Sequence, residues 1–265
     1  MRTFKYFLLV SALFVFALYS SGRSASNSGQ FQDFTLTLAT PKASYLELQP
    51  IPIVITLKNE TDAPLVGHGA LEFGTGFLHL YVDRGDGPQE VSVSPFTMTV
   101  IAPPREFKPG EEVQKLGRLS FKLNKLFPKP GTYKLHVQLM SNDGKESVSS
   151  KPIEVEIVAP DGLDAHALQF IREHGDPAYF FTGLQAVKKP EKLQVLENFL
   201  AVYGETTYAD EASFALGEVQ FARRDYQKAR KLFEKLSKKS DYVFAGEVSE
   251  YLQLIEREEK KKERP

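Results

Sequence analysis

The sequence predicts a multidomain protein in which an all-β domain is followed by an all-α domain. Apolar and polar residues alternate with a period of two from Phe31 to about Val158, which is typical of half-buried β-strands. After the segment 159–162 the alternation stops, and apolar residues recur at spacings of three and four, as in amphipathic helices. The length of 265 residues also fits two domains, because one domain usually holds about 100 to 200 residues.

Residues 1–22 have the three-part layout of a secretory signal peptide. A positive start with Arg2 and Lys5 precedes an apolar run, and small residues follow that run up to Gly22. The apolar run is shorter than the roughly 20 residues that a membrane-spanning helix needs. We therefore expect the signal to be removed, residues 23–30 to form a flexible leader, and the mature protein to be periplasmic or extracellular, with no membrane span.

Residues 31–160 are predicted to form a β-sandwich. They contain a series of short strand-like runs: FTLTLAT, PIVITLKN, FLHLYV, VSVS, TMTVIA, GRLSFKL, TYKLHVQL and IEVEIV. Between some of these runs stand residues that tolerate positive φ, namely DRGDG at 83–87 and NDG at 142–144. Both segments predict hairpin tips.

Three stretches of this part, PIPIVITLKNETDAPL, FKPGEEV and PGTYKLHVQL, together resemble the immunoglobulin-like domains of many bacterial envelope proteins. The resemblance covers about half of the chain and implies an immunoglobulin-like fold for the sandwich. The run PGTY resembles a tyrosine corner, which implies that the Tyr133 hydroxyl bonds to a nearby backbone group. No activity follows from this resemblance, because a fold alone does not define a function.

Residues 161–258 are predicted to form a helical domain, and residues 259–265 a charged tail. Six segments have helical spacing: AHALQFIREHG, AYFFTGLQAV, EKLQVLENFLAVYG, YADEASFALGEVQFAR, YQKARKLFEKLSKK and VFAGEVSEYLQLIEREEKKK. A shift of about 34 residues aligns similar residues in two copies, and that period is typical of tetratricopeptide repeats. The aligned pairs are Ala178 with Ala212, Phe180 with Phe214, Gly183 with Gly217, Phe199 with Phe233 and Tyr208 with Tyr242.

The central copy resembles a tetratricopeptide repeat at Leu216-Gly217, Phe221, Asp225-Tyr226, Ala229, Phe233 and Leu236. In that family the first helix of each repeat lines a concave face that binds a peptide or helix of another protein. The resemblance therefore implies these protein-binding residues: Phe180, Leu184, Phe214, Glu218, Phe221, Val248 and Leu252. The alternative is that these side chains are core residues, packed against neighbouring helices or against the β-domain.

Several classes of function are disfavoured by the composition. Lys and Arg total 33 against 34 for Asp and Glu, so no overall field attracts the chain to nucleic acid. The absence of Cys excludes disulfides and thiolate metal sites, and the five His residues show no metal-binding spacing. We find no catalytic motif such as G-x-S-x-G, and we expect no catalytic, cofactor-binding or metal-binding residues.

These observations predict an exported, non-enzymatic adaptor of the cell envelope that binds a partner protein or peptide in the repeat groove. The stretch from Leu196 to Leu236 is also similar to repeats of bacterial outer-membrane assembly and Tol-Pal accessory proteins. Two alternatives stay open: a carbohydrate or cell-wall binding module, and a proteinase inhibitor that acts through the loop 94–106. The absence of Trp disfavours sugar binding. The oligomeric state is left undefined.

Overall fold

The computed structural model of the chain describes residues 31–95 and 102–262. The predicted signal peptide and leader lie outside the described residues. So do residues 96–101 of the predicted inhibitor loop and the end of the predicted tail, 263–265.

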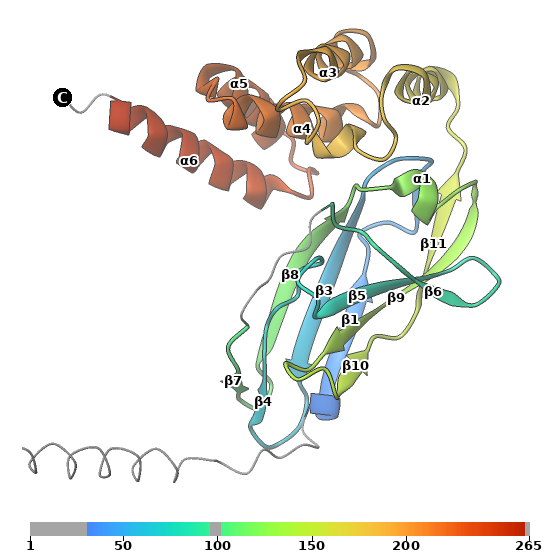
Figure 1. The fold of residues 1–265 in the computed structure, drawn as a ribbon, viewed down its shortest axis with the longest axis vertical. Helices are drawn as coiled ribbons and strands as arrows, with labels where there is room; N and C mark the ends of the chain where they lie inside the picture. Colours follow the sequence, from blue (N-terminus) through green and yellow to red (C-terminus); the bar gives the residue numbers. More distant parts are fainter. Residues whose placement is uncertain (1–30, 96–101, 263–265) are drawn as a thin grey trace, which may run out of the picture.

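The described chain begins with a strand half, residues 31–158, which lies below the helices in Figure 1. It opens with a 3₁₀ turn, η1 (Phe31–Asp33), and includes one short helix, α1 (Leu123–Leu126). Its strands are β1 (Phe34–Ala39), β2 (Ser44–Leu46), β3 (Ile51–Asn59), β4 (Leu65–Gly67), β5 (Leu78–Asp83), β6 (Pro88–Val91), β7 (Arg105–Phe107), β8 (Glu112–Leu119), β9 (Gly131–Met140), β10 (Ser147–Ser149) and β11 (Ile153–Val158).

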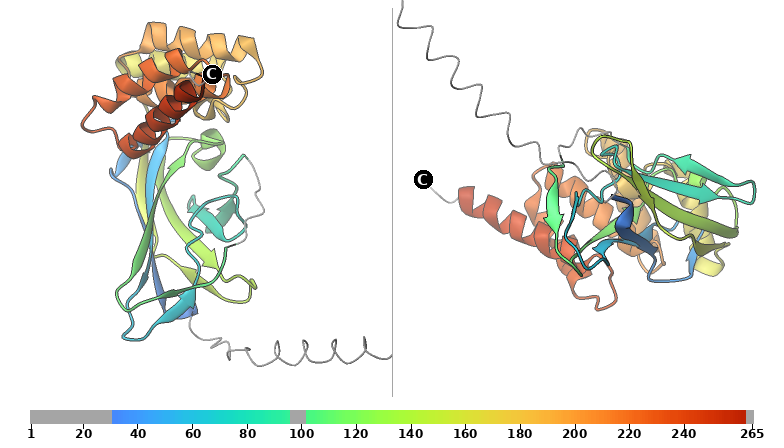
Figure 2. Two further views of the ribbon diagram at one scale, coloured as in Figure 1. Left: turned by 90° about the vertical axis from the view of Figure 1, so that its left-hand side faces the viewer. Right: turned by 90° about the horizontal axis from the view of Figure 1, so that it is seen from below.

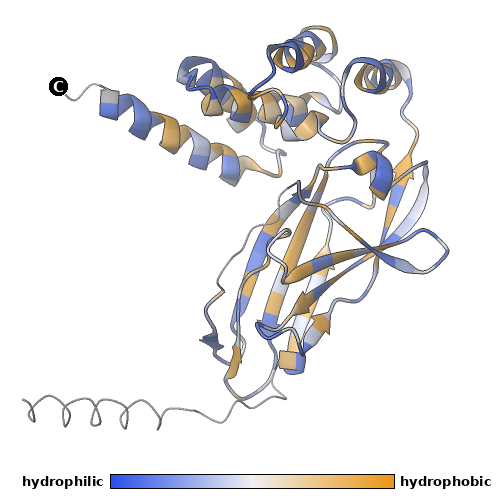
Figure 3. Ribbon diagram, in the orientation of Figure 1, coloured by the Kyte–Doolittle hydropathy of each residue, from blue (hydrophilic) through white to orange (hydrophobic). Residues whose placement is uncertain are grey.

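The strands form three sheets. One has the order β1-β3-β8, a larger one has the order β2-β11-β9-β5-β6 with β10 beside β9, and a small one pairs β4 with β7. The pairs are antiparallel except for β2 with β11, which run parallel, so the larger sheet is mixed. Apolar and polar residues alternate along the long strands (Figure 3), and the apolar faces meet in the core.

Local predictions in the strand half are confirmed at several points. The segment 83–87 joins β5 to β6, with Gly85 and Gly87 at positive φ and the Asp83 carboxylate accepting from both of their amides. The segment 142–144 joins β9 to β10. The Tyr133 hydroxyl donates to the backbone carbonyl of Lys129 at 2.6 Å, so the expected backbone bond is present.

The helical half, residues 162–262, lies at one end of the strand half (Figures 1 and 2). It consists of α2 (Gly162–His174), the 3₁₀ turn η2 (Phe180–Thr182), α3 (Pro190–Tyr203), α4 (Ala209–Ala222), α5 (Tyr226–Ser237) and α6 (Ala245–Lys262). Among the helices of residues 31–95 and 102–262, none combines the length and apolar character that crossing a bilayer requires.

The helix predicted over 178–187 is wrong, because this segment contains only the short turn η2. Gly183 ends the turn in the left-handed region, with φ of 61°. A Cβ added at Gly183 would lie 2.7 Å from Val219 Cγ2 and 2.9 Å from the Ala215 carbonyl oxygen. The close approach of this segment to α4 therefore requires glycine, and the left-handed conformation stops the helix.

The predicted fold class, an immunoglobulin-like all-β domain followed by a tetratricopeptide-like all-α domain, is also wrong. The chain has a mixed α/β fold with a mixed sheet, and α1 lies within the strand half. One buried apolar cluster contains residues of both halves, including Tyr45 of β2 and Leu48 from the strand half and Tyr208 and Leu216 from the helical half. Periodicity reports which side of an element is buried, but not which element covers it, so it could not show this shared burial.

Candidate functional site

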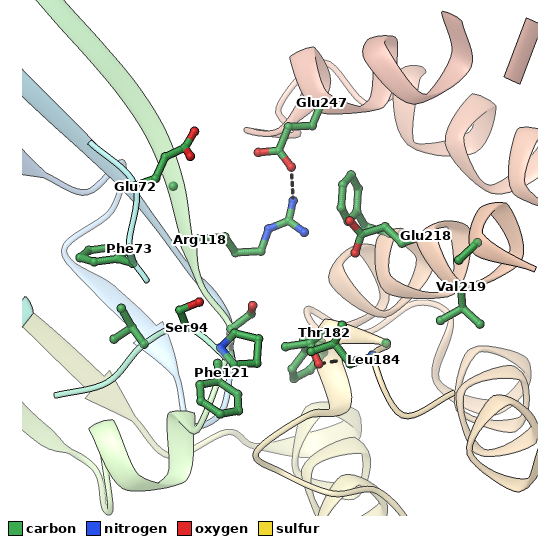
Figure 4. Close-up of a pocket in the computed structure, with 18 of the residues that line it drawn as sticks. Glu72, Phe73, Ser94, Arg118, Phe121, Thr182, Leu184, Glu218, Val219 and Glu247 are labelled. Atoms are coloured by element: carbon green, nitrogen blue, oxygen red, sulfur yellow. Dashed lines mark hydrogen bonds and ion pairs between the residues drawn. The ribbon is translucent and has the colours of Figure 1, made fainter. Parts of the chain in front are cut away.

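A cavity of about 520 Å³ lies where β8 and the helical half meet (Figure 4). Gly117 and Arg118 of β8 belong to one wall, and Leu184, Glu218 and Phe221 belong to the opposite wall. A second hollow of about 620 Å³ shares Glu218 and Phe221 with the first and extends beside α6. We call these two adjoining hollows together the junction cleft, because both halves contribute to their walls.

Arg118 is the central charged residue of the junction cleft. Its Nε atom lies 3.2 Å from Glu211 Oε2, and its Nη2 atom lies 3.6 Å from Glu247 Oε2. The guanidinium also lies over two aromatic rings, 4.0 Å from the centre of Phe214 and 3.8 Å from that of Phe244. The side chains of Arg118 and Glu211 are each only 11% exposed, so this ion pair is largely removed from water.

The regular geometry of α4 brings the Arg118 partner Glu211 and the cleft residues onto one face. Glu211, Phe214, Glu218 and Phe221 follow one another at spacings of three and four, so they lie on one face of the helix. Gly217 allows α4 to pack closely on α5, since a Cβ there would lie 2.8 Å from the Phe233 ring. The charged face of α4 is thus directed towards β8.

Burial sets the protonation of the three carboxylates around Arg118. It raises the pKa of Glu211 and Glu247, although Arg118 acts in the opposite direction on both. For Arg118 itself burial works to lower the pKa, but the neighbouring carboxylates outweigh it and the net pKa is raised. The guanidinium therefore stays charged, whereas burial makes ionisation of the carboxylates less favourable.

Glu218 is placed differently from the other two carboxylates. Its Oε1 atom accepts a hydrogen bond from the Tyr251 hydroxyl at 2.9 Å, and its side chain points across the cleft towards Arg118 (Figure 4). Burial raises its pKa to about 6, while Arg118 and the Tyr251 hydrogen bond lower it by less. Glu218 is therefore mostly ionised at neutral pH in a poorly solvated position.

An exposed ion pair marks the mouth of the cleft. Lys115 Nζ on β8 lies 2.8 Å from Glu72 Oε1, and the two side chains are about half exposed. Both residues line the 520 Å³ cavity. Such an exposed pair contributes little to stability, because water and salt screen it.

The structure divides the sequence-predicted binding residues into two groups. Leu184, Glu218 and Phe221 line the junction cleft, and Leu252 is partly buried against a second apolar cluster, which is formed by residues of the segment from α4 to α6. Phe180, Phe214 and Val248 are buried, with Phe214 only 1% exposed. For these three positions the core alternative therefore describes their environment, although Phe214 also forms part of the cavity lining.

Sequence reasoning missed Arg118, Lys115 and Glu247. Arg118 stands in the strand-like run GRLSFKL, where polar and apolar residues alternate, so its charge gave no signal of its own. Its partners lie far along the chain, and spacing alone does not identify them. Within residues 31–95 and 102–262 no group of three or more His, Asp or Glu side chains could hold a metal ion.

Comparisons with known proteins give no family for this chain. No family model and no curated protein matches it.

Among solved structures, the sporulation control protein Spo0M of Bacillus subtilis is 12% identical over 53% of this chain and 55% of that one, with a TM-score of 0.32. A mutant β-glucosidase of Listeria innocua with laminaribiose is 16% identical over 48% and 16%, with a TM-score of 0.28. The alkylpurine DNA glycosylase AlkC of Pseudomonas fluorescens, bound to DNA, is 14% identical over 48% and 31%, with a TM-score of 0.29. The chain thus spans about half of Spo0M and much less of the other two, and these weak likenesses assign no activity.

Proposed function

We propose that this chain is a protein-interaction adaptor of the cell envelope, and that its junction cleft binds a segment of a partner protein. The observation that carries the proposal is the cleft itself. It is a concave space with largely apolar walls and a few convergent charged groups, which is the usual character of a binding site. The export signal predicted in residues 1–22 supports action outside the cytoplasm.

The pairing of the charged groups favours binding over catalysis. Both cations of the cleft already have partners, Lys115 with Glu72 and Arg118 with Glu211 and Glu247. A general acid or base needs a reacting group within hydrogen-bond reach and a partner that orients it. Paired cations beside apolar walls are better suited to recognising the shape and charge of a polypeptide.

The absence of Cys from the chain allows a direct test with a single introduced thiol. Leu184→Cys, labelled with an environment-sensitive dye, reports on the cleft wall, and Val66→Cys, 54% exposed on β4, is the matched control. Peptides selected from a random displayed library against the full chain are then titrated onto both labelled proteins. We expect them to change the signal at position 184 with a saturable curve and to leave the signal at 66 unchanged. Peptides that change neither signal, or both equally, would contradict a binding site in the cleft.

A further inference from the structure

We propose that the occupant of the junction cleft is an extended segment that adds as a strand to the outer edge of β8 and directs a Lys or Arg side chain towards Glu218. This inference rests on the proposed binding function and names the class of partner. It combines two independent features of the cleft, the direction of the β8 backbone groups and the charge of the walls.

The first feature is the edge position of β8. Among the strands of residues 31–95 and 102–262, β8 pairs with β3 and with no other strand. Residues opposite each other in an antiparallel pair alternate between exchanging two backbone hydrogen bonds and exchanging none. Arg118 lies opposite Pro52, which has no N–H to donate. This pair therefore belongs to the kind that exchanges none, and the backbone N–H and C=O of Arg118 point away from β3.

The same alternation extends along β8. Leu116 is two residues from Arg118, so its backbone groups also point outward. The other end of the ladder agrees, because the Asn59 amide donates to the Glu111 carbonyl, which places the odd-numbered residues of β8 on the β3 side. Leu116 lines the second hollow of the cleft and Arg118 lines the first. The outward backbone groups thus follow the cleft, where an added strand could pair with them.

The second feature is the acidic balance of the walls. Four carboxylates, Glu72, Glu218, Glu247 and Glu250, line the cleft together with two cations, Lys115 and Arg118. The ion pairs engage Glu72 with Lys115, and Glu247 with Arg118. Neither Glu218 nor Glu250 has a cation within ion-pair distance in the described residues. A partner of complementary charge is therefore cationic at this point.

Burial makes a cation more favourable at Glu218 than at an exposed acid. The Glu218 carboxylate keeps one hydrogen bond, from Tyr251, and is poorly solvated. A Lys or Arg side chain would supply further donors and an opposite charge in a place where water screens little. The apolar side chains of Leu184, Val219 and Phe221 line the same hollow and favour apolar neighbours on the same segment. The class of partner is therefore an extended peptide with a basic residue among apolar or β-branched ones.

The test uses the peptides selected against the full chain with the Leu184→Cys reporter. We expect Lys or Arg at one shared position, and we expect replacement of that residue by Gln to weaken binding roughly tenfold or more. Methylation of single backbone nitrogens should weaken binding strongly at alternate positions and little at those between, since only alternate residues of an added strand face β8. Equal tolerance of methylation at every position would overturn the strand addition.

Glu218→Gln provides the complementary variant on the protein side. Gln keeps an oxygen that can accept from Tyr251, so the local fold is retained while the charge is removed. We expect it to weaken the basic peptides but not their Gln versions, and Glu234→Gln on the exposed face of α5 to change neither. The preference for a basic peptide is the ratio of its affinity to that of its Gln version. If this ratio were the same for Glu218→Gln as for wild type, the charge assignment would be overturned. If those peptides still report at position 184, the cleft remains a binding site and only the class of partner is wrong.

Discussion

The helical half contacts the strand half on two sides that are built differently. On the closed side, Tyr208 is fully buried, and its hydroxyl donates to the Glu47 carbonyl at 2.7 Å. Arg172 pairs with the Glu47 carboxylate, and within the helical half the Thr207 amide, next to Tyr208, donates to Asp164 at 2.8 Å. On the open side, Arg118 and its carboxylates border the junction cleft. The same helices therefore meet the strand half through a filled contact and through a hollow one.

The two sides differ in how well their buried polar groups are satisfied, and this difference affects the stability of the folded state. On the closed side the named polar groups have hydrogen-bond partners and adjoin the continuous apolar cluster. On the open side three buried polar atoms form no well-directed hydrogen bond, namely Arg118 Nε, Arg118 Nη2 and Glu211 Oε2. Each of them lies within ion-pair distance of an opposite charge. Such groups cost free energy in the folded state. A side that keeps them next to a cavity is better suited to binding than to holding the halves together.

Among the substitutions considered, removal of Arg118 should cause the largest loss of stability, and it acts on the open side. Arg118→Met keeps much of the contact with Phe214 and Phe244 but leaves Glu211 buried without its cation. We expect a loss of about 3 to 5 kcal/mol in the free energy of unfolding, measured by urea denaturation at pH 7.5. Arg257→Met, at an exposed position on α6, is the control and should change stability by less than about 0.5 kcal/mol. A similar loss in the free energy of unfolding for both variants would show that the ion cluster contributes little to the stability of the open side.

The same contrast explains which features the sequence could predict. Strands such as β3 and β9 and the turns at 83–87 follow from neighbouring residues, because period-two burial and positive φ are local properties. The ion pair between Arg118 and Glu211 joins residues far apart in the chain, and no spacing rule brings them together.

Long-range contacts also explain the points at which sequence and structure differ. Phe214 has the spacing of a groove residue and lines the cleft, and it is buried because the Arg118 side chain covers its ring. The predicted helix over 178–187 failed because Gly183 packs against α4, which is again a long-range contact. The fold class failed because the parallel pairing of β2 with β11 and the apolar cluster shared by the two halves also depend on contacts between distant residues.

The difference in stability between Glu218→Gln and wild type should depend on pH, and this dependence tests the open side. The pKa of Glu218 is raised from 4.5 to about 6, so the folded state binds this proton more tightly than the unfolded state. The resulting stabilisation is complete below pH 4.5 and is lost as the pH rises through 6. Because one pKa unit corresponds to about 1.4 kcal/mol, the variant should be more stable than wild type by up to about 2 kcal/mol at pH 7.5.

The pH profile distinguishes this cause from a general change in packing. The difference between Glu218→Gln and wild type should shrink between pH 7.5 and pH 5, measured by urea denaturation at both values. The raised pKa values of Glu211 and Glu247 affect both proteins and largely cancel in that difference. A gain in stability that is the same at the two pH values would contradict burial of an ionised Glu218.

The smallest effect is expected on the closed side, from Tyr208→Phe. The change removes only the hydroxyl that bonds to the Glu47 carbonyl, while the ring keeps its stacking on Phe181. One neutral hydrogen bond contributes about 1 kcal/mol, so the free energy of unfolding should fall by about that amount. Because Tyr208 does not line the junction cleft, the peptide affinity read at Leu184→Cys should stay unchanged. A parallel loss of affinity would mean that the two sides are coupled through α4, which begins one residue after Tyr208. The cleft would then be a property of the whole junction, and stabilising the closed side would be expected to strengthen binding on the open one.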